Sequence, residues 1–246
     1  MQKRLVITIL LAISGCRKIE QRLHHDSPQK LLQAAQGNMH SGAFNAAAEN
    51  FKEIADLFCY LSWAPESRLM SAYAFFLAKE YIEAQSQLST FESLYATHPM
   101  MDYALYLKGH IHMCKVRKMS TDKRDLPIAI QTFQTLMHTY PKSKYVPYAK
   151  QCIQRLEQFY IDGEIIAIRK AFKKQYYEQV LNRCQRLLDQ YSDVIPAITM
   201  YVDACLCLKI DKVASHMLEK YKDVINEHPE LLQAQQKINA YRMQSK

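Results

Sequence analysis

The residues best suited to chemistry in this chain of 246 residues are its seven cysteines and nine histidines. Cys205 and Cys207 have the spacing of a metal motif, but residues two apart on a helix point about 200° from one another. His110 and Cys114 lie one helical turn apart, and two ligands without a third favour a packing role. The sequence also shows no phosphate-binding glycine loop, nucleophile elbow or HExxH helix. We therefore predict no enzyme, no metal and no cofactor.

One cysteine, Cys16, closes a segment with the features of an export signal. Residues 1–16 have a basic start, nine mostly apolar residues from 5 to 13, and two small residues before the cysteine. Nine apolar residues are too few to span a bilayer as a mature helix. The end of this segment resembles the lipobox of bacterial lipoproteins, in which the thiol takes a diacylglyceryl group and the new amino terminus a further acyl chain, typically palmitate. The alternative is an ordinary secretory signal with a chance cysteine. The other six cysteines fall at apolar helical positions, which predicts small buried hydrophobes, although pairing in an oxidising compartment stays open.

The elements that carry these residues are amphipathic helices that repeat along the chain. In the stretch 126–141, small and apolar residues follow the offsets four, three and five that characterise the second helix of a tetratricopeptide (TPR) repeat. Runs with similar offsets begin at Phe44, Tyr81 and Tyr177, and prolines 28, 65 and 99 lie 37 and 34 residues apart. The sequence therefore predicts an all-α, TPR-like superhelical solenoid of about five helix pairs and a closing helix. The expected pairs cover 27–59, 64–96, 99–140, 143–191 and 193–226, and the closing helix covers 229–243.

The formal charge of the chain is +8, and its basic residues are spread along the predicted helices. A modest excess with this distribution is typical of solvated outer faces. We predict no nucleic-acid partner.

Aromatic residues crowd the second repeat, which also holds the only tryptophan of the chain. In a TPR array the first helix of each pair lines the concave face, so this crowding favours a groove that binds a peptide. Ordinary helix packing is the alternative for each residue taken singly. The candidate groove residues are Tyr60, Trp63, Arg68, Tyr73 and Phe76.

The run from 97 to 109, with the pattern THPxxDYxxYxxG, is far more specific than the helix pattern. Together with the lipobox and the five repeats, it resembles the BamD family, TPR lipoproteins of the machinery that assembles β-barrel proteins in the outer membrane. The turn before the second repeat departs from the family's usual Tyr-Pro pair. The signature residues of the run are His98, Pro99, Asp102, Tyr103, Tyr106 and Gly109.

The resemblance implies a lipoprotein of Gram-negative bacteria, anchored in the outer membrane through Cys16 and facing the periplasm. It implies three kinds of partner: a BamA-like barrel protein with POTRA domains, other Bam lipoproteins, and unfolded outer-membrane β-barrel proteins. Asn182 and Arg183 match an Asn-Arg pair of the family, whose arginine pairs with an acidic residue of the fifth POTRA domain. The planar guanidinium suits this role because it holds a carboxylate at two points.

The domain layout expected from these features has three parts. Residues 1–15 form a lipoprotein signal peptide, 16–26 a lipidated tether, and 27–246 the solenoid, with a groove half at about 27–140 and a partner-docking half at about 143–246. Another TPR lipoprotein, such as a secretin pilotin or a regulator of a cell-wall enzyme, is the alternative function, because it would share the lipobox and the repeats.

Overall fold

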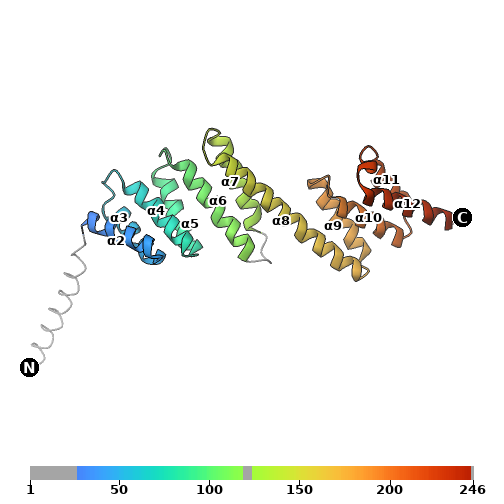
Figure 1. The fold of residues 1–246 in the computed structure, drawn as a ribbon, viewed down its shortest axis with the longest axis horizontal. Coiled ribbons are helices and arrows are strands. Elements are labelled where there is room, and N and C mark those ends of the chain that lie inside the picture. The colour runs from blue at the N-terminus through green and yellow to red at the C-terminus, as the bar shows by residue number, and fades with distance from the viewer. Residues whose placement is uncertain (1–26, 119–123, 245–246) are drawn as a thin grey trace, which may run out of the picture. The chain divides into compact units, whose positions relative to one another are not determined.

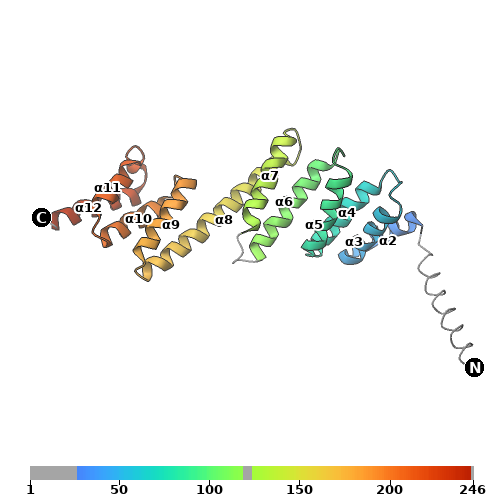
Figure 2. The same cartoon turned by 180° about the vertical axis from the view of Figure 1, so that it is seen from behind.

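The computed structural model describes residues 27–118 and 124–244, and no strand falls within these ranges. Consecutive helices pair as hairpins, which confirms the predicted all-α, TPR-like solenoid and its helix pairs (Figures 1 and 2). None of the described helices is long and apolar enough to cross a membrane. The helices are α2 (Pro28–Ser41), α3 (Phe44–Leu57), α4 (Ala64–Leu77), α5 (Tyr81–Leu94), α6 (Met101–Lys118), α7 (Asp125–Thr139), α8 (Val146–Lys173), α9 (Tyr177–Gln190), α10 (Ile195–Cys207), α11 (Asp211–Glu219) and α12 (Pro229–Gln244), with a short 3₁₀ helix at Ile225–Glu227.

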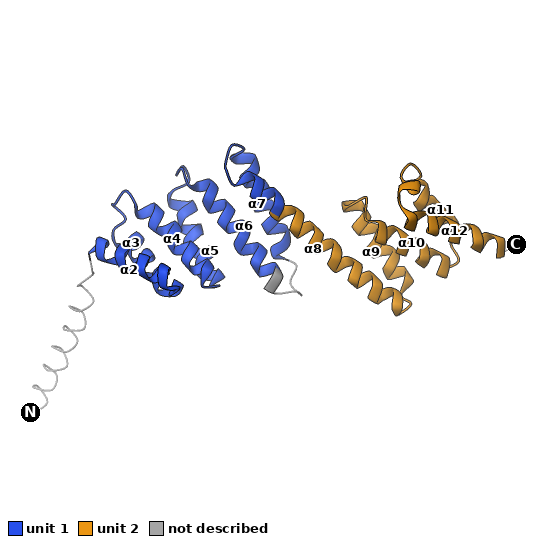
Figure 3. Cartoon of the chain, in the orientation of Figure 1, with its two compact units in different colours: residues 1–151 blue, residues 152–246 orange. Residues whose placement is uncertain are grey.

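The chain divides into two compact units, with the division inside α8 (Figure 3). Unit 1 ends at Gln151 and contains α2 to α7 and the first residues of α8. Unit 2 begins at Cys152 and contains the rest of α8 and α9 to α12. Each unit has its own hydrophobic core.

Four of the hairpins share one turn, in which a single residue adopts a left-handed backbone conformation. That residue has φ of 79° at Gly42, 65° at Lys79, 62° at Gln175 and 63° at Lys209. The next backbone N–H then reaches a carbonyl five residues back, as Tyr176 N–H does with the Ala171 carbonyl at 3.1 Å. This bond satisfies a helix-end carbonyl and sets the second helix antiparallel to the first.

Small residues set the spacing of the helices in unit 1. The alanines of α2 to α5 that the repeat pattern singles out are fully buried, including Ala35, Ala47, Ala72 and Ala84. Where an alanine faces the neighbouring helix, the two backbones approach closely and larger side chains such as Phe51 and Phe91 fill the space beside them. Unit 1 therefore packs as a continuous layer of helix pairs.

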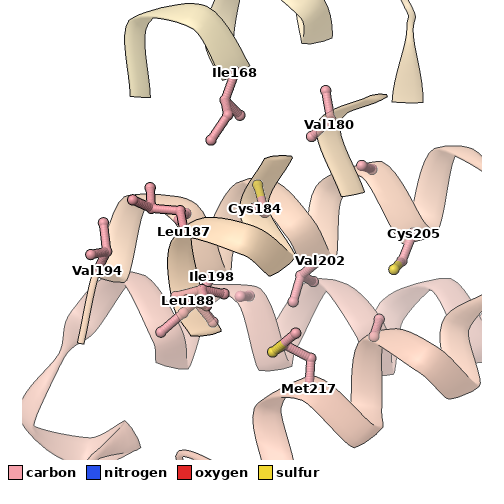
Figure 4. Close-up of a cluster of buried hydrophobic side chains, with 14 of the residues drawn as sticks. Ile168, Val180, Cys184, Leu187, Leu188, Val194, Ile198, Val202, Cys205 and Met217 are labelled. Carbon is pink, nitrogen blue, oxygen red and sulfur yellow. The ribbon is translucent and has the colours of Figure 1, made fainter. Parts of the chain in front are cut away.

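The core of unit 2 is built from α8 to α12. Ile168 of α8 faces Val180 and Cys184 of α9, and residues of α10 and α11 close the cluster (Figure 4). Leu231 and Ile238 of α12 are fully buried against the same core. The closing helix is therefore part of the folded unit.

Gly109 lies at a close contact between α6 and α7 in unit 1. A Cβ atom at this position would lie 2.5 Å from Cε1 of Phe133, which is itself fully buried on α7. Real Cβ atoms do not approach so closely, so only glycine lets α6 pack on the Phe133 ring. By contrast, a Cβ atom at Gly163 of α8 would meet nothing within 4 Å.

We predict that Gly109→Ala lowers the free energy of unfolding by about 1–3 kcal/mol, because the new methyl group forces the Phe133 ring out of place. The matched control, Gly163→Ala, raises it by about 0.5–1 kcal/mol, since alanine costs less backbone entropy in a helix. Urea unfolding of the full chain, followed by circular dichroism, measures both. Equal effects of the two substitutions would contradict this packing.

Candidate partner-docking and peptide-binding sites

Within the signature run, the Asp102 carboxylate, in the first turn of α6, accepts two hydrogen bonds. Its Oδ1 accepts a hydrogen bond from the Tyr103 N–H at 2.7 Å, and its Oδ2 accepts one from the Ser143 hydroxyl at 2.6 Å. The Ser143 Oγ in turn accepts the Tyr145 N–H at 3.1 Å. Asp102 therefore ties the start of α6 to the turn that opens α8.

Aromatic rings cover this polar contact. Tyr106 stacks on Tyr145 with centroids 4.8 Å apart, and Tyr103 lies 5.5 Å from the same ring. Burial raises the pKa of Tyr103 far above its ordinary value, and the neighbouring Tyr73 adds to the shift. His98 packs edge-on against Phe91 at 5.5 Å. The signature residues thus form an internal clamp within unit 1.

A hollow of about 470 Å³ opens between α2 and α4 in unit 1. Its walls are mostly apolar, and α2 and α4 are the first helices of their pairs, as a concave TPR surface requires. The Glu66 Oε2 atom, on a residue that lines the hollow, is buried and has no hydrogen-bond partner among the described residues. The lining residues are Leu32, Gln36, Met39, His40, Phe51, Trp63, Glu66, Ser67 and Met70.

Of the five groove candidates, Trp63 lines this hollow and the other four are placed elsewhere. Tyr60 is 76% exposed and packs edge-on against Phe58, while Tyr73 and Phe76 pack as partly buried residues against the core of unit 1. The α2 residues of the hollow were not predicted, although Leu32, Gln36, Met39 and His40 recur at the three- and four-residue steps of one helix face.

Arg68 is the candidate that the structure corrects. The residue is only 5% exposed, and its guanidinium donates to Gln87 Oε1 at 2.9 Å and to Asp56 Oδ1 at 2.6 Å. These partners lie on α5 and α3, so the fork of Arg68 joins three helices from inside the unit. The side chain is therefore placed in the interior rather than in a surface groove.

Arg183 lies on α9 in unit 2 and makes an ion pair with α8. Its Nη1 donates to Glu164 Oε2 at 2.9 Å, with 37% of the Arg183 side chain and 11% of the Glu164 side chain exposed. The preceding Asn182 is exposed. The arginine thus helps to hold α9 on α8, and about a third of its side chain stays exposed.

A family model described as "YfiO: Outer membrane lipoprotein" matches residues 24–220. The chain belongs to this family. It is 27% identical over 230 residues to the outer membrane protein assembly factor BamD of Neisseria meningitidis serogroup B, covering 85% of this chain and 84% of that protein. The BamD of Vibrio cholerae is 24% identical over 197 residues, covering 75% and 82%, and that of Caulobacter vibrioides 22% over 215 residues, covering 85% and 70%. The resemblance predicted from the signature run is confirmed.

Among the described residues of this YfiO-family chain, three cysteines are buried, Cys114 is half-buried and two are exposed. Cys205 is buried and Cys207 exposed, which confirms that the two point in different directions. The prediction that all six are buried is wrong for Cys207 and for Cys59, which is also exposed. Burial raises the pKa of Cys184 to about 12 and that of Cys205 to about 11, so both thiols stay protonated at neutral pH. Cys16 lies outside the described residues.

His110, the histidine considered with Cys114, packs against aromatic rings. Its ring lies 4.5 Å from Tyr106 and 5.7 Å from Phe133. Among the described residues, no group of three or more histidine, cysteine or acidic side chains is placed to hold a metal ion.

A buried polar contact that the sequence did not reveal lies at the start of α7. The ring of His112 sits between Asp125 Oδ1, 2.7 Å from its Nδ1, and Gln85 Nε2, 2.9 Å from its Nε2. Lys115 Nζ lies 3.3 Å from the same Asp125 oxygen. These contacts fix the first residue of α7 against α5 and α6 in this YfiO-family fold.

We predict that Arg183→Glu lowers the free energy of unfolding by about 1–2 kcal/mol, because it places a second carboxylate against Glu164 in a partly buried site. The control Arg186→Glu, on the exposed face of the same helix, changes it by about 0.5 kcal/mol or less. Urea unfolding of the full chain measures both variants. If Arg183→Glu lowered the free energy of unfolding no more than Arg186→Glu does, the ion pair would contribute nothing to stability.

Proposed function

We propose that this chain is an outer-membrane lipoprotein scaffold that helps to assemble β-barrel proteins. The observation that carries the proposal is the family match over residues 24–220, supported by relatives that bear the name outer membrane protein assembly factor. The scaffold acts by binding and orienting its partners, without a covalent step.

The membrane anchor in this proposal is Cys16. After removal of the signal peptide 1–15, the thiol carries a diacylglyceryl group and the new amino terminus a further acyl chain, because several chains anchor stably where one does not. Residues 16–26 then form the tether, and the helical units face the periplasm.

Unit 2 docks a BamA-like barrel protein through Asn182 and Arg183. The guanidinium has five N–H donors, and the contact with Glu164 occupies Nη1. Since the side chain is 37% exposed, donors remain for a carboxylate of a POTRA domain. Glu164 also fixes the direction of the arginine, which reduces the conformational entropy lost on docking.

Unit 1 receives the carboxy-terminal segment of an unfolded barrel protein in the hollow between α2 and α4. Such a segment is apolar and aromatic, which suits walls that include Met39, Trp63 and Met70. The buried Glu66 Oε2 offers an acceptor for a backbone N–H of the bound peptide. A preformed helical surface binds an extended peptide without having to order itself at the same time.

The experiment that tests this function is affinity purification of the tagged, lipidated chain from detergent-solubilised membranes. We expect a large POTRA-containing barrel protein to copurify with the wild type. The double variant Asn182→Ala/Arg183→Lys keeps a positive charge facing Glu164 but loses the planar fork, so we expect it to recover about tenfold less partner, as for loss of a charge-assisted contact. This variant avoids the folding defect expected of Arg183→Glu.

The matched control is Asn239→Ala/Arg155→Lys, which makes the same changes at exposed positions of α12 and α8. It should recover as much partner as the wild type. Recovery of a secretin or a cell-wall synthase in place of the barrel protein would overturn the function. Equal recovery by both double variants would overturn the docking residues alone.

A further inference from the structure

The two opposite ends of the helices of unit 2 differ in the sign of their charged residues. The first set, here called the basic edge, consists of the α8–α9 turn (170–178), the α10–α11 turn (207–213) and the last turn of α12 (240–244). It contains six basic and two acidic residues. The second set, the acidic edge, consists of 189–195 and 219–230 and contains six acidic and two basic residues. The 14 residues of α9 separate the two edges by about 20 Å.

Side-chain contacts show that each edge is continuous. At the basic edge, the Tyr177 hydroxyl lies beside the Cys207 thiol. Arg242 of α12 donates to Asp211 Oδ2 at 2.8 Å and to Ser215 Oγ at 2.7 Å. At the acidic edge, the Tyr221 hydroxyl donates to the Ser192 carbonyl at 2.8 Å. The three segments of the basic edge therefore lie side by side.

The basic edge also carries exposed apolar side chains among its lysines. Tyr176 is 53% exposed, Ile210 37%, Val213 42% and Met243 80%. Its lysines, at positions 170, 173, 174, 209 and 212, are all exposed. Lysines that surround protruding tyrosine and aliphatic side chains form the pattern that binds a bilayer interface, where the charges meet headgroups and the apolar tips enter the acyl boundary.

The helix hairpins do not require basic residues at their turns. The α4–α5 turn of unit 1 has the same left-handed turn at Lys79, yet the residues that follow it, Glu80 and Glu83, are acidic. The cations of the basic edge are therefore not needed to close the hairpins.

We propose that the basic edge of unit 2 binds the surface of an anionic phospholipid membrane, with the acidic edge turned away from it. A lipid surface fits better than an acidic protein, because lysine is depleted from protein interfaces and acts as a point charge without the fork that reads a carboxylate. Lysines near an anionic bilayer are attracted by its surface potential without specific geometry. This contact goes beyond the proposed scaffold function and uses none of its docking residues.

The test is cosedimentation of the mature chain, residues 16–246 carrying Cys16→Ser, with vesicles of phosphatidylethanolamine and phosphatidylglycerol. This chain has neither the apolar signal segment nor an acyl anchor. We expect the partition coefficient to fall about tenfold or more when four lysines of the basic edge are neutralised, and binding to weaken in high salt. The variant is Lys173→Gln/Lys174→Gln/Lys209→Gln/Lys212→Gln.

The matched control removes the same charge elsewhere, by Lys142→Gln/Lys144→Gln/Lys220→Gln/Lys222→Gln, and should bind within about twofold of the unchanged chain. Equal losses in both variants, or equal binding to vesicles with phosphatidylcholine in place of phosphatidylglycerol, would overturn the proposal. So would loss of a copurifying protein from the basic-edge variant while its vesicle binding is unchanged, since the edge would then serve an acidic protein.

A second measurement locates the contact. In a Trp63→Phe background, Tyr176→Trp places a fluorophore on the basic edge, and Val224→Trp places one on the acidic edge, where Val224 is 36% exposed. Brominated phosphatidylglycerol should quench Tyr176→Trp and leave Val224→Trp unchanged. Equal quenching of the two would contradict the proposed orientation.

Discussion

The close approach of paired helices is the constraint on which the rest of the structure depends. Fully buried alanines let the helices of unit 1 meet backbone to backbone, and at Gly109 even one methyl group would collide with Phe133. Such contacts leave little freedom in the angle between helices, because a tightly packed interior does not deform continuously. The hollow between α2 and α4 follows from that rigidity, since its walls are held in place before any ligand arrives.

The signature run (97–109) contributes to this rigidity. Asp102, Ser143 and the ring of Tyr145 join the start of α6 to the start of α8. The run therefore encodes an internal clamp, while the surfaces proposed to bind partners are formed by other residues. In the proposed function, Arg183 has both a packing role and a docking role, because its contact with Glu164 holds α9 and also fixes the direction of a side chain that is partly exposed.

The fold was predictable because it depends on periodicity and small residues, which are local properties of the sequence. The candidate sites were less predictable from the sequence, because whether a helical residue is buried or exposed depends on helices that lie far away in the sequence. Arg68 follows the aromatic-rich turn in sequence, which suggested a position in the groove. Its hydrogen bonds with Asp56 and Gln87 instead hold the side chain in the interior. The α2 wall of the hollow was not predicted, because nothing in the sequence near Leu32 and Met39 shows that α4 packs beside them to form a hollow. Cys207 is exposed because its neighbour Cys205 takes the buried position.

The central claim is that unit 1 presents a preformed apolar hollow for an extended peptide. Trp63 tests it most directly, because it is the only tryptophan of the chain and lines the hollow. The measurement is a titration of the full chain with a peptide that ends in phenylalanine, following tryptophan emission and circular dichroism together. We predict a saturable blue shift, no gain in helix content, and loss of the shift when the terminal phenylalanine is replaced by serine. An unchanged emission, or a shift that requires new helix to form, would contradict a preformed site.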